Sequence, residues 1–204
     1  MLEWVAKTDF TQEENLQKLR ENMIVESYLD YVAMQMYTCN QDLSNIRAYR
    51  SLTEDKHWRF VIYDFDLSFR LNADNYVDDW FERKAGTITG QDTTLFRRLM
   101  KNDGLRDYFL KRVAWLTVEK YNPQRVVSRI QARRDLIRDE MVRNCQRWSW
   151  SYATWEAEVD RILDYARVRP GIFIGYVCDA FKLDDAQKQQ YFGEALQKIA
   201  EYGG

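Results

Sequence analysis

Apolar and polar residues alternate along most of the chain with the period of an α-helix. From Val25 to Tyr37 the apolar positions recur at i, i+3, i+4 and i+7, so residues 11–37 are predicted to form one long amphipathic helix or two joined ones. Thr11 and Glu14 stand where a capping box would begin this helix. The same period predicts helices over 94–101, 105–120, 124–147 and 154–167, and two shorter helices over 172–201.

Turn-forming residues indicate where these helices begin and end. Asn102-Asp103-Gly104 is a C-cap-like sequence after the helix at 94–101, and Pro123 suits the first turn of the next long helix. Arg169-Pro170-Gly171 is predicted to break the helix that starts at 154. Leu183-Asp184-Asp185 separates the last two helices, and residues 70–93, which are polar and lack a clear period, predict a long loop.

A period-two pattern interrupts the helices after residue 45. Residues 46–50 and 58–63 are rich in β-branched and aromatic side chains, and the polar sequence SLTEDKH joins them. This pattern predicts a β-hairpin. The predicted fold is therefore α+β and mainly α-helical, with one small hairpin, in a single domain that spans residues 1–204.

The composition is that of a folded globular protein. Hydrophobic residues make up 46% of the chain and charged residues 30%, with a formal net charge of −2, so we expect no nucleic-acid partner and no attraction to an anionic membrane. No apolar run is long enough to span a membrane, and the N-terminal sequence lacks the pattern of a signal peptide. Cys39, Cys145 and Cys178 are too widely spaced for a metal site and are predicted to be buried free thiols.

Acidic and amide side chains gather around the predicted hairpin. Asp42 and Asn45 precede its first strand, and Asp64 and Asp66 end its second. Alternation along a strand would put Asp64 and Asp66 on the same side, and oxygen ligands of this kind suit Mg²⁺, which keeps positions for water or phosphate oxygens. The alternative is that the acids cap turns and pair with neighbouring arginines, namely Arg47, Arg50 or Arg59.

The order of these residues is that of the catalytic parts of protein kinases. In those enzymes an Asp orients or deprotonates the acceptor hydroxyl, an Asn holds a metal ion, and a later Asp bridges the metal to the β and γ phosphates. Phosphoryl transfer requires mainly positioning and charge neutralisation from the protein, so few residue types are needed.

Residues 40–69 and their flanking helices resemble the spore coat protein H (CotH) kinase family, which has an atypical protein-kinase-like fold. The matching positions in this stretch are Asn40, Asp42, Asn45, Tyr49-Arg50, Trp58, Tyr63, Asp64 and Asp66. Later matching positions are Pro123, Arg125-Val126, Glu140-Met141, Arg147-Trp148, Arg169-Pro170, Phe181 and Leu183. The resemblance covers nearly the whole chain.

The resemblance implies a kinase that transfers the γ-phosphoryl group of ATP to Ser or Thr of a protein substrate, such as a coat or surface protein. Asp42 would be the catalytic residue. Asn45 and Asp64 would hold the nucleotide through Mg²⁺ or Mn²⁺, with Asp66 as a further metal ligand. The interval from Asp42 to Asn45 is shorter than in ordinary kinases. The family also implies a spore-coat or cell-surface setting, although the residues themselves do not identify a compartment.

Residues 1–39 depart from the family pattern. They are predicted to be helical and show no nucleotide-covering loop, phosphate-contacting Lys or acidic partner. The chain is therefore expected to be a kinase-like C-terminal lobe without its N-terminal lobe, inactive alone, with an uncovered interface that favours self-association. The competing hypothesis is a non-catalytic helical scaffold or coat-assembly module, in which the acids only cap turns.

Two other groups of residues are predicted to be structural. The arginines of 124–147 alternate with acids at helical spacing, which predicts a solvated, ion-paired face rather than a phosphate groove. The tryptophans Trp148, Trp150 and Trp155 are predicted to belong to the core or to a lobe interface rather than to a ligand-stacking platform.

Overall fold

The computed structural model describes residues 2–40, 42, 46–70, 74–82 and 93–202, and this part of the chain is mainly helical with a two-stranded sheet. The helices are α1 (Leu2–Lys7), α2 (Glu13–Arg20), α3 (Val25–Thr38), α4 (Tyr76–Glu82), α5 (Thr94–Leu99), α6 (Asp103–Glu119), α7 (Pro123–Trp148), α8 (Tyr152–Ala180) and α9 (Asp185–Glu201). The strands β1 (Arg47–Tyr49) and β2 (Arg59–Val61) are antiparallel, with Ala48 opposite Phe60. The predicted mainly helical α+β fold and the predicted hairpin are confirmed.

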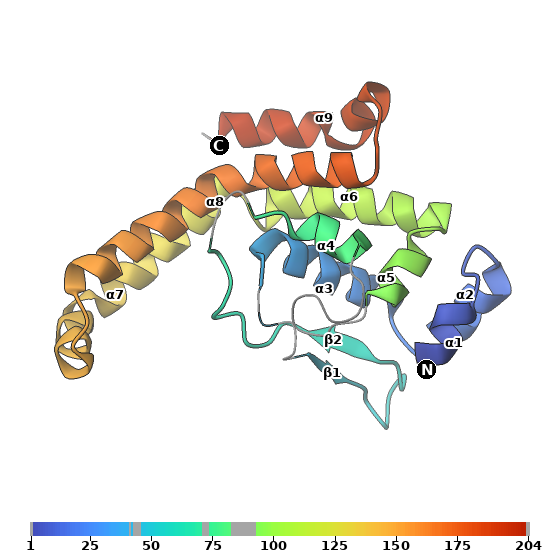
Figure 1. The fold of residues 1–204 in the computed structure, drawn as a ribbon, viewed down its shortest axis with the longest axis horizontal. Helices are drawn as coiled ribbons and strands as arrows, with labels where there is room; N and C mark the ends of the chain where they lie inside the picture. Colours follow the sequence, from blue (N-terminus) through green and yellow to red (C-terminus); the bar gives the residue numbers. More distant parts are fainter. Residues whose placement is uncertain (1, 41, 43–45, 71–73, 83–92, 203–204) are drawn as a thin grey trace.

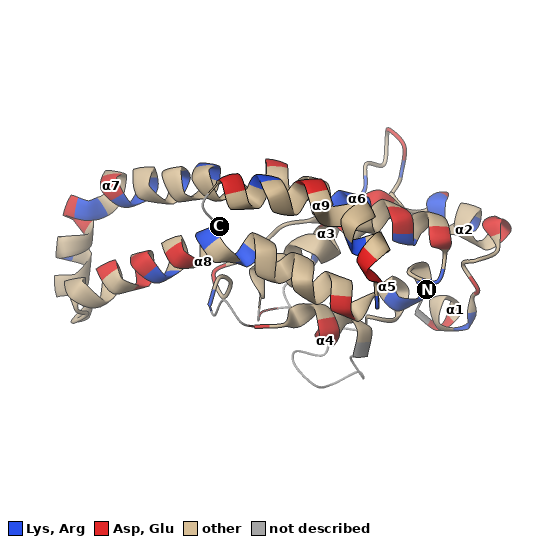
Figure 2. Cartoon of the chain, turned by 90° about the horizontal axis from the view of Figure 1, so that it is seen from above, with Lys and Arg blue, Asp and Glu red and all other residues tan. Residues whose placement is uncertain are grey.

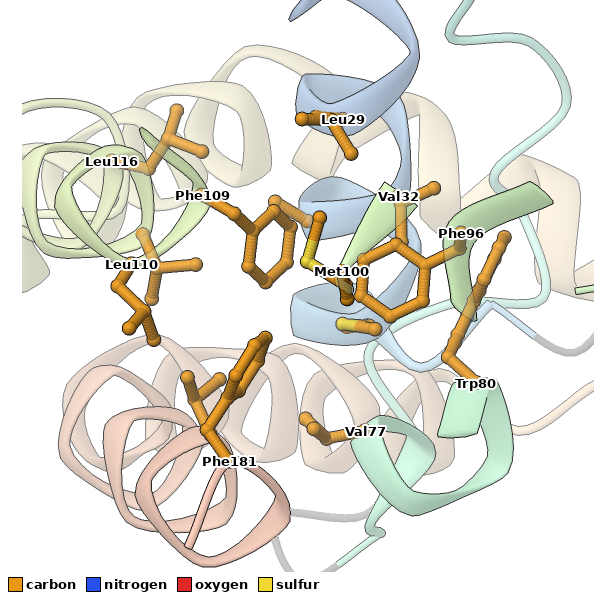
Figure 3. Packing of buried hydrophobic residues seen from close by; sticks show 14 of the residues in the cluster. Leu29, Val32, Val77, Trp80, Phe96, Met100, Phe109, Leu110, Leu116 and Phe181 are labelled. Atoms are coloured by element: carbon orange, nitrogen blue, oxygen red, sulfur yellow. The ribbon is translucent and has the colours of Figure 1, made fainter. Parts of the chain in front are cut away.

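Helix α3 lies at the centre of the molecule and is buried on almost every side. Helices α4, α6 and α8 pack against it, β2 lies on the opposite side, and α9 covers α6 and α8 (Figure 1). Between these helices, the rings of Phe96, Phe109 and Phe181 follow one another with centroids 5.2 and 5.8 Å apart (Figure 3). This continuous apolar core holds α3 fixed, so that its C-terminal end can serve as a rigid support.

Helix α7 and the first part of α8 form a long antiparallel pair that projects from the rest of the molecule (Figures 1 and 2). We call this pair, residues 123–162, the arm. Within α7 Arg134 and Arg138 pair with Asp135, in agreement with the predicted ion-paired face. The core prediction for the tryptophans is wrong at the arm tip, where Trp148 and Trp150 are 57% and 66% exposed, because no described element packs over them.

The predicted capping box at the start of α2 is not formed. The carboxylate Oδ1 of Asp9 accepts hydrogen bonds from both the backbone N–H and the hydroxyl of Thr11, at 3.0 and 2.8 Å. Helix α2 therefore begins one residue later, with Gln12 at the cap position, and Glu14 pairs with Lys18 at 2.6 Å instead of reaching back. Asp9 thus occupies the backbone N–H of Thr11 that Glu14 would bind in a capping box, and it also binds the hydroxyl that would accept from Glu14.

Helix α8 continues through Pro170, where the sequence predicts a break. A proline inside a helix costs about 3 kcal/mol because it removes a hydrogen bond and crowds the preceding turn. Phe173, Ile174 and Val177 follow it and are at most 1% exposed, and burying each such side chain contributes about 1.5–3 kcal/mol. The apolar contacts of the second half of α8 therefore exceed the cost of the proline.

The predicted loop at 70–93 contains a helix, α4, whose Val77 and Trp80 are fully buried. The side-chain oxygen of Asn75 accepts hydrogen bonds from the backbone N–H groups of Val77 and Asp78, at 3.1 and 3.3 Å, and so starts the helix. With only seven residues, α4 is too short to show a helical period in the sequence.

Asn102 begins α6 instead of ending α5. Its side-chain oxygen accepts from the backbone N–H of Leu105 at 3.0 Å, and its amide donates to the carbonyl of Phe10 at 2.9 Å. Asn122 caps α7 in the same way, accepting from Arg125 at 3.0 Å, and so provides a matched control.

We expect Asn102→Ala to lower the free energy of unfolding by about 2 kcal/mol, because it removes both a cap and a donor to a buried segment. Asn122→Ala should cost about 1 kcal/mol, since it removes a cap. Urea unfolding followed by circular dichroism measures both, and equal losses would contradict the role of the bond to Phe10.

Candidate active site

Two contacts hold the hairpin against the N-terminal end of α3. The backbone N–H of Trp58 donates to the carbonyl of Asn22 at 2.9 Å, and the N–H of Ile24 donates to the carbonyl of Trp58 at 3.0 Å. The ring of Phe60 lies against Tyr28 and Tyr31 of α3, with centroids 5.0 and 5.3 Å apart. Strand β2 is thereby fixed at one end of the central helix.

The segment after β2 runs to the other end of α3. The backbone N–H of Phe69 donates to the carbonyl of Thr38, the last residue of α3, at 2.9 Å. Asp64 and Asp66 precede Phe69, whereas Asp42 follows Thr38 by four residues. The two segments that carry the predicted acids are therefore tied together at the C-terminal end of α3.

Asp42 belongs to a local turn that Asn40 organises. The side-chain oxygen of Asn40 accepts from the backbone N–H of Asp42 at 3.1 Å, and its amide lies 3.4 Å from the Asp42 carbonyl. Asn40 is buried, whereas the side chain of Asp42 is half-buried. The buried amide thus fixes the backbone from which Asp42 projects. Asn45, the predicted metal-associated residue, lies outside the described residues.

Asp64 and Asp66 lie beyond the sheet, because β2 ends at Val61. Asp64 has a φ of 55°, in the left-handed region that residues other than glycine rarely adopt. The prediction that strand alternation places both acids on one side is therefore wrong. Both residues are exposed. Cys39 and Phe69, with φ of 50° and 56°, add two further left-handed residues around the same helix end, and each conformation of this kind costs about 1–3 kcal/mol.

The chemistry of these side chains fits a hard divalent cation that is shared with a phosphate ligand. Carboxylate oxygens are the donors that Mg²⁺ prefers, and it commonly takes only one or two of them, with phosphate and water completing its shell. In the part of the chain that the structure describes, no three or more His, Cys, Asp and Glu side chains come together as a metal site. The described acids therefore do not form an all-protein metal cage.

The arginines around the hairpin have other contacts. Arg59 forms an ion pair with Asp55, and its guanidinium holds the pKa of that carboxyl well below its usual range. The guanidinium of Arg47 lies over the ring of Tyr63 and that of Arg50 over Trp58, with distances of 4.9 and 5.2 Å to the ring centroids. Of the three arginines that could have paired with the candidate site acids, Arg59 is therefore paired with a different acid, Asp55.

Three residues of α8, which we call the α8 clamp, bind the backbone around the C-terminal end of α3. They are Arg161, Tyr165 and Arg169, spaced by four so that they share one face of the helix. Arg161 donates to the carbonyls of Phe69 and Arg70, and the Tyr165 hydroxyl donates to the carbonyl of Tyr37. The α8 clamp thereby holds the segments on both sides of the candidate site.

Arg169 is the most deeply buried member of the α8 clamp, with 0% of its surface exposed. Its guanidinium donates to the carbonyls of Met36, Tyr37 and Asp74 at 3.1, 3.0 and 2.7 Å. The last carbonyls of a helix lack intrahelical donors and carry partial negative charge, so a cation stabilises them. The sequence offered a signal that was missed, namely three hydrogen-bonding residues at intervals of four within an apolar helix.

Cys39 completes this buried cluster. Its sulfur lies 2.8 Å from Nη2 of Arg169, and burial raises the pKa of the thiol while the nearby guanidinium lowers it. A raised pKa keeps the sulfur protonated near neutral pH, so Cys39 is suited to packing and not to nucleophilic attack. All three cysteines are buried and free, as predicted.

A family model described as CotH kinase protein matches residues 1–173, which is most of the chain. No curated protein and no solved structure matches the chain. The matched range includes both acid-bearing segments and the α8 clamp, and it ends before α9.

Proposed function

The chain belongs to the CotH kinase protein family, and from this membership we propose that it forms the C-terminal lobe of an atypical protein kinase. The proposed reaction is transfer of the γ-phosphoryl group of ATP to a Ser or Thr hydroxyl of a protein substrate. The observation that carries the proposal is the hydrogen bond from Phe69 to Thr38, because it ties the Asp64 segment to the Asp42 segment at one end of α3.

Each described residue has a role that its position supports, and Asn45 takes its role from the family resemblance alone. Asp42, held by the buried amide of Asn40, orients the acceptor hydroxyl and accepts its proton. The exposed carboxylates of Asp64 and Asp66, with Asn45, would hold Mg²⁺ or Mn²⁺. When bound, the metal neutralises charge on the β and γ phosphates. The α8 clamp keeps both segments in place. Positioning of this kind is the main contribution that phosphoryl transfer requires from a protein.

The domain arrangement is part of the same proposal. Residues 1–204 act as one domain, and a nucleotide-covering lobe would pack beside the exposed hairpin, whose β1 residues are all exposed. Between residues 2 and 39 the described backbone is helical or irregular apart from one isolated bridge at Met23. The phosphate-contacting strand would therefore have to be supplied from elsewhere, and these residues alone would not be active. A coat or surface protein is the proposed substrate. Within the described ranges, no helix has the length and apolar character needed to cross a membrane.

Metal binding tests this proposal without requiring a nucleotide lobe. At Mn²⁺ concentrations about 100-fold above Kd, binding to the folded state should raise stability by about 2.7 kcal/mol. For a chain of this size that corresponds to a rise in the unfolding midpoint of about 5–10 °C. Asp64→Asn combined with Asp66→Asn should remove the rise, whereas Asp55→Asn, in the hairpin turn, should keep it. An equal rise in all three proteins, or none in the wild type, would contradict the proposed site.

A scaffold or coat-assembly module is the second candidate, and the arm is the observation that favours it. Trp148 and Trp150 are exposed at its tip, and exposed apolar groups of this kind favour association with another protein or another copy. A scaffold without catalysis would show no metal-dependent rise in the unfolding midpoint, so the same experiment separates the two candidates.

A further inference from the structure

A groove of about 600 Å³ lies where the arm leaves the body of the molecule. Its apolar floor combines side chains of both parts, namely Tyr37, Phe69 and Tyr121 from the body and Val126, Ile130 and Trp155 from the arm. We call this cavity the arm groove. Its volume lies within the range of ligand-binding clefts, and it is open along the arm.

Cationic side chains line the arm groove, and none of its described lining residues is acidic. The cations are Lys120, Arg125, Arg129, Arg133 and Arg134. Arg134 pairs with Asp135 at 2.8 Å, whereas Arg129 and Arg133 form no ion pair with any residue in the described part of the chain. The groove therefore combines an apolar floor with positive charge that is not neutralised locally.

The spacing of the cations indicates the shape of the partner. Arg125, Arg129 and Arg133 are four residues apart on α7, so they recur about every 6 Å along one edge of the groove. Val126 and Ile130 lie beside them and repeat with the same interval. A second helix that carries carboxylates every fourth residue, next to an apolar stripe, has the complementary spacing.

We infer that the arm groove binds an acidic amphipathic helix of a partner protein. A lipid headgroup concentrates its negative charge at one point and would meet only one or two of the cations, whereas a helix can meet the whole row. The apolar stripe of the same helix would cover the floor and remove Ile130 and Trp155 from water. Phe69 joins the floor to the segment that carries Asp64 and Asp66, so the bound helix would lie beside the candidate site.

Binding can be measured without nucleotide, metal or catalysis, so its outcome is independent of the proposed kinase function. The probe is a fluorescently labelled synthetic helix with Glu at every fourth position beside a Leu stripe, and fluorescence anisotropy reports its affinity. The control peptide has Gln in place of every Glu. The variant R129Q/R133Q removes two groove cations, and R143Q/R147Q removes two charges from α7 outside the groove lining.

We expect R129Q/R133Q to weaken binding of the Glu peptide about tenfold and R143Q/R147Q to leave it within about twofold of the wild type. The Gln peptide should bind weakly to all proteins, and added salt should reduce the affinity of the Glu peptide for the wild type. Equal affinities of both variants, or no binding of the Glu peptide, would overturn the inference. A lipid surface is the other possible occupant. If the wild type sediments with phosphatidylglycerol vesicles, R129Q/R133Q does not, and the Glu peptide fails to bind, the groove binds lipid and the inference of a helical partner is overturned.

Discussion

With the nucleotide-covering lobe of the proposed kinase present, Asp42→Ala and Asp64→Ala are each expected to abolish measurable transfer of the γ-phosphoryl group from ATP. Loss of a group that orients the hydroxyl and accepts its proton lowers a rate by about 10²–10⁴-fold. Loss of a residue that neutralises developing charge lowers it by about 10²–10³-fold. Incorporation of labelled phosphate into a protein substrate, or into the protein itself, measures both effects.

A stability measurement is needed beside this assay. Asp42 is half-buried, and Asp64 is exposed but has a left-handed backbone, with a φ of 55°, which Asp adopts more readily than Ala. Both variants should remain folded, with Asp64→Ala the less stable of the two. Asp55→Ala is the matched control, because Asp55 is an acid of the same hairpin that pairs with Arg59 away from the two tied segments. Full activity in both Asp42→Ala and Asp64→Ala would refute the kinase assignment, whereas equal loss in Asp55→Ala would show that any change to the hairpin is damaging.

Local periodicity was sufficient to predict the helices that carry a broad apolar face, such as α3, and the hairpin around residue 54. It failed where contacts distant in sequence decide the structure. Pro170 reads as a helix break, but the core contacts of the residues after it keep α8 continuous. The α4 helix is fixed by the burial of Trp80 against Phe96, a contact that no local pattern contains.

The order of the acids identified the candidate site, but the sequence could not give its geometry. Asp64 was expected to extend a strand, and it adopts instead a left-handed conformation three residues after β2 has ended. The segment that follows it is held at Phe69 and Arg70 by bonds to Thr38 and Arg161, which lie far from that segment in sequence. Candidate residues could therefore be proposed from the sequence, whereas the contacts that hold their segments could not.

Those supports predict the largest effect on stability, at Arg169. Arg169→Met keeps an unbranched side chain in the cavity but removes the guanidinium donors to the carbonyls of Met36 and Asp74, which then keep only the weak thiol donor of Cys39. A buried acceptor that loses its partner costs about 1–3 kcal/mol, and the variant weakens three such acceptors at once, namely the carbonyls of Met36, Tyr37 and Asp74, so the free energy of unfolding should fall by about 3–5 kcal/mol. The unfolding midpoint should fall by about 10 °C. Urea and thermal unfolding measure the two quantities.

Two further variants separate the role of Arg169 from that of any arginine on α8. Arg167→Met removes an exposed side chain that pairs with Asp164 at 3.2 Å and should cost less than about 0.5 kcal/mol. Arg169→Lys keeps the charge but reaches fewer carbonyls, so its stability should lie between those of Arg169→Met and the wild type. If Arg169→Met were as stable as Arg167→Met, the end of α3 would be held by other contacts. If the stability of Arg169→Lys lies between the other two, the geometry of the guanidinium, and not its charge alone, fixes the C-terminal end of α3. Asp42 and Asp64 are positioned from that helix end.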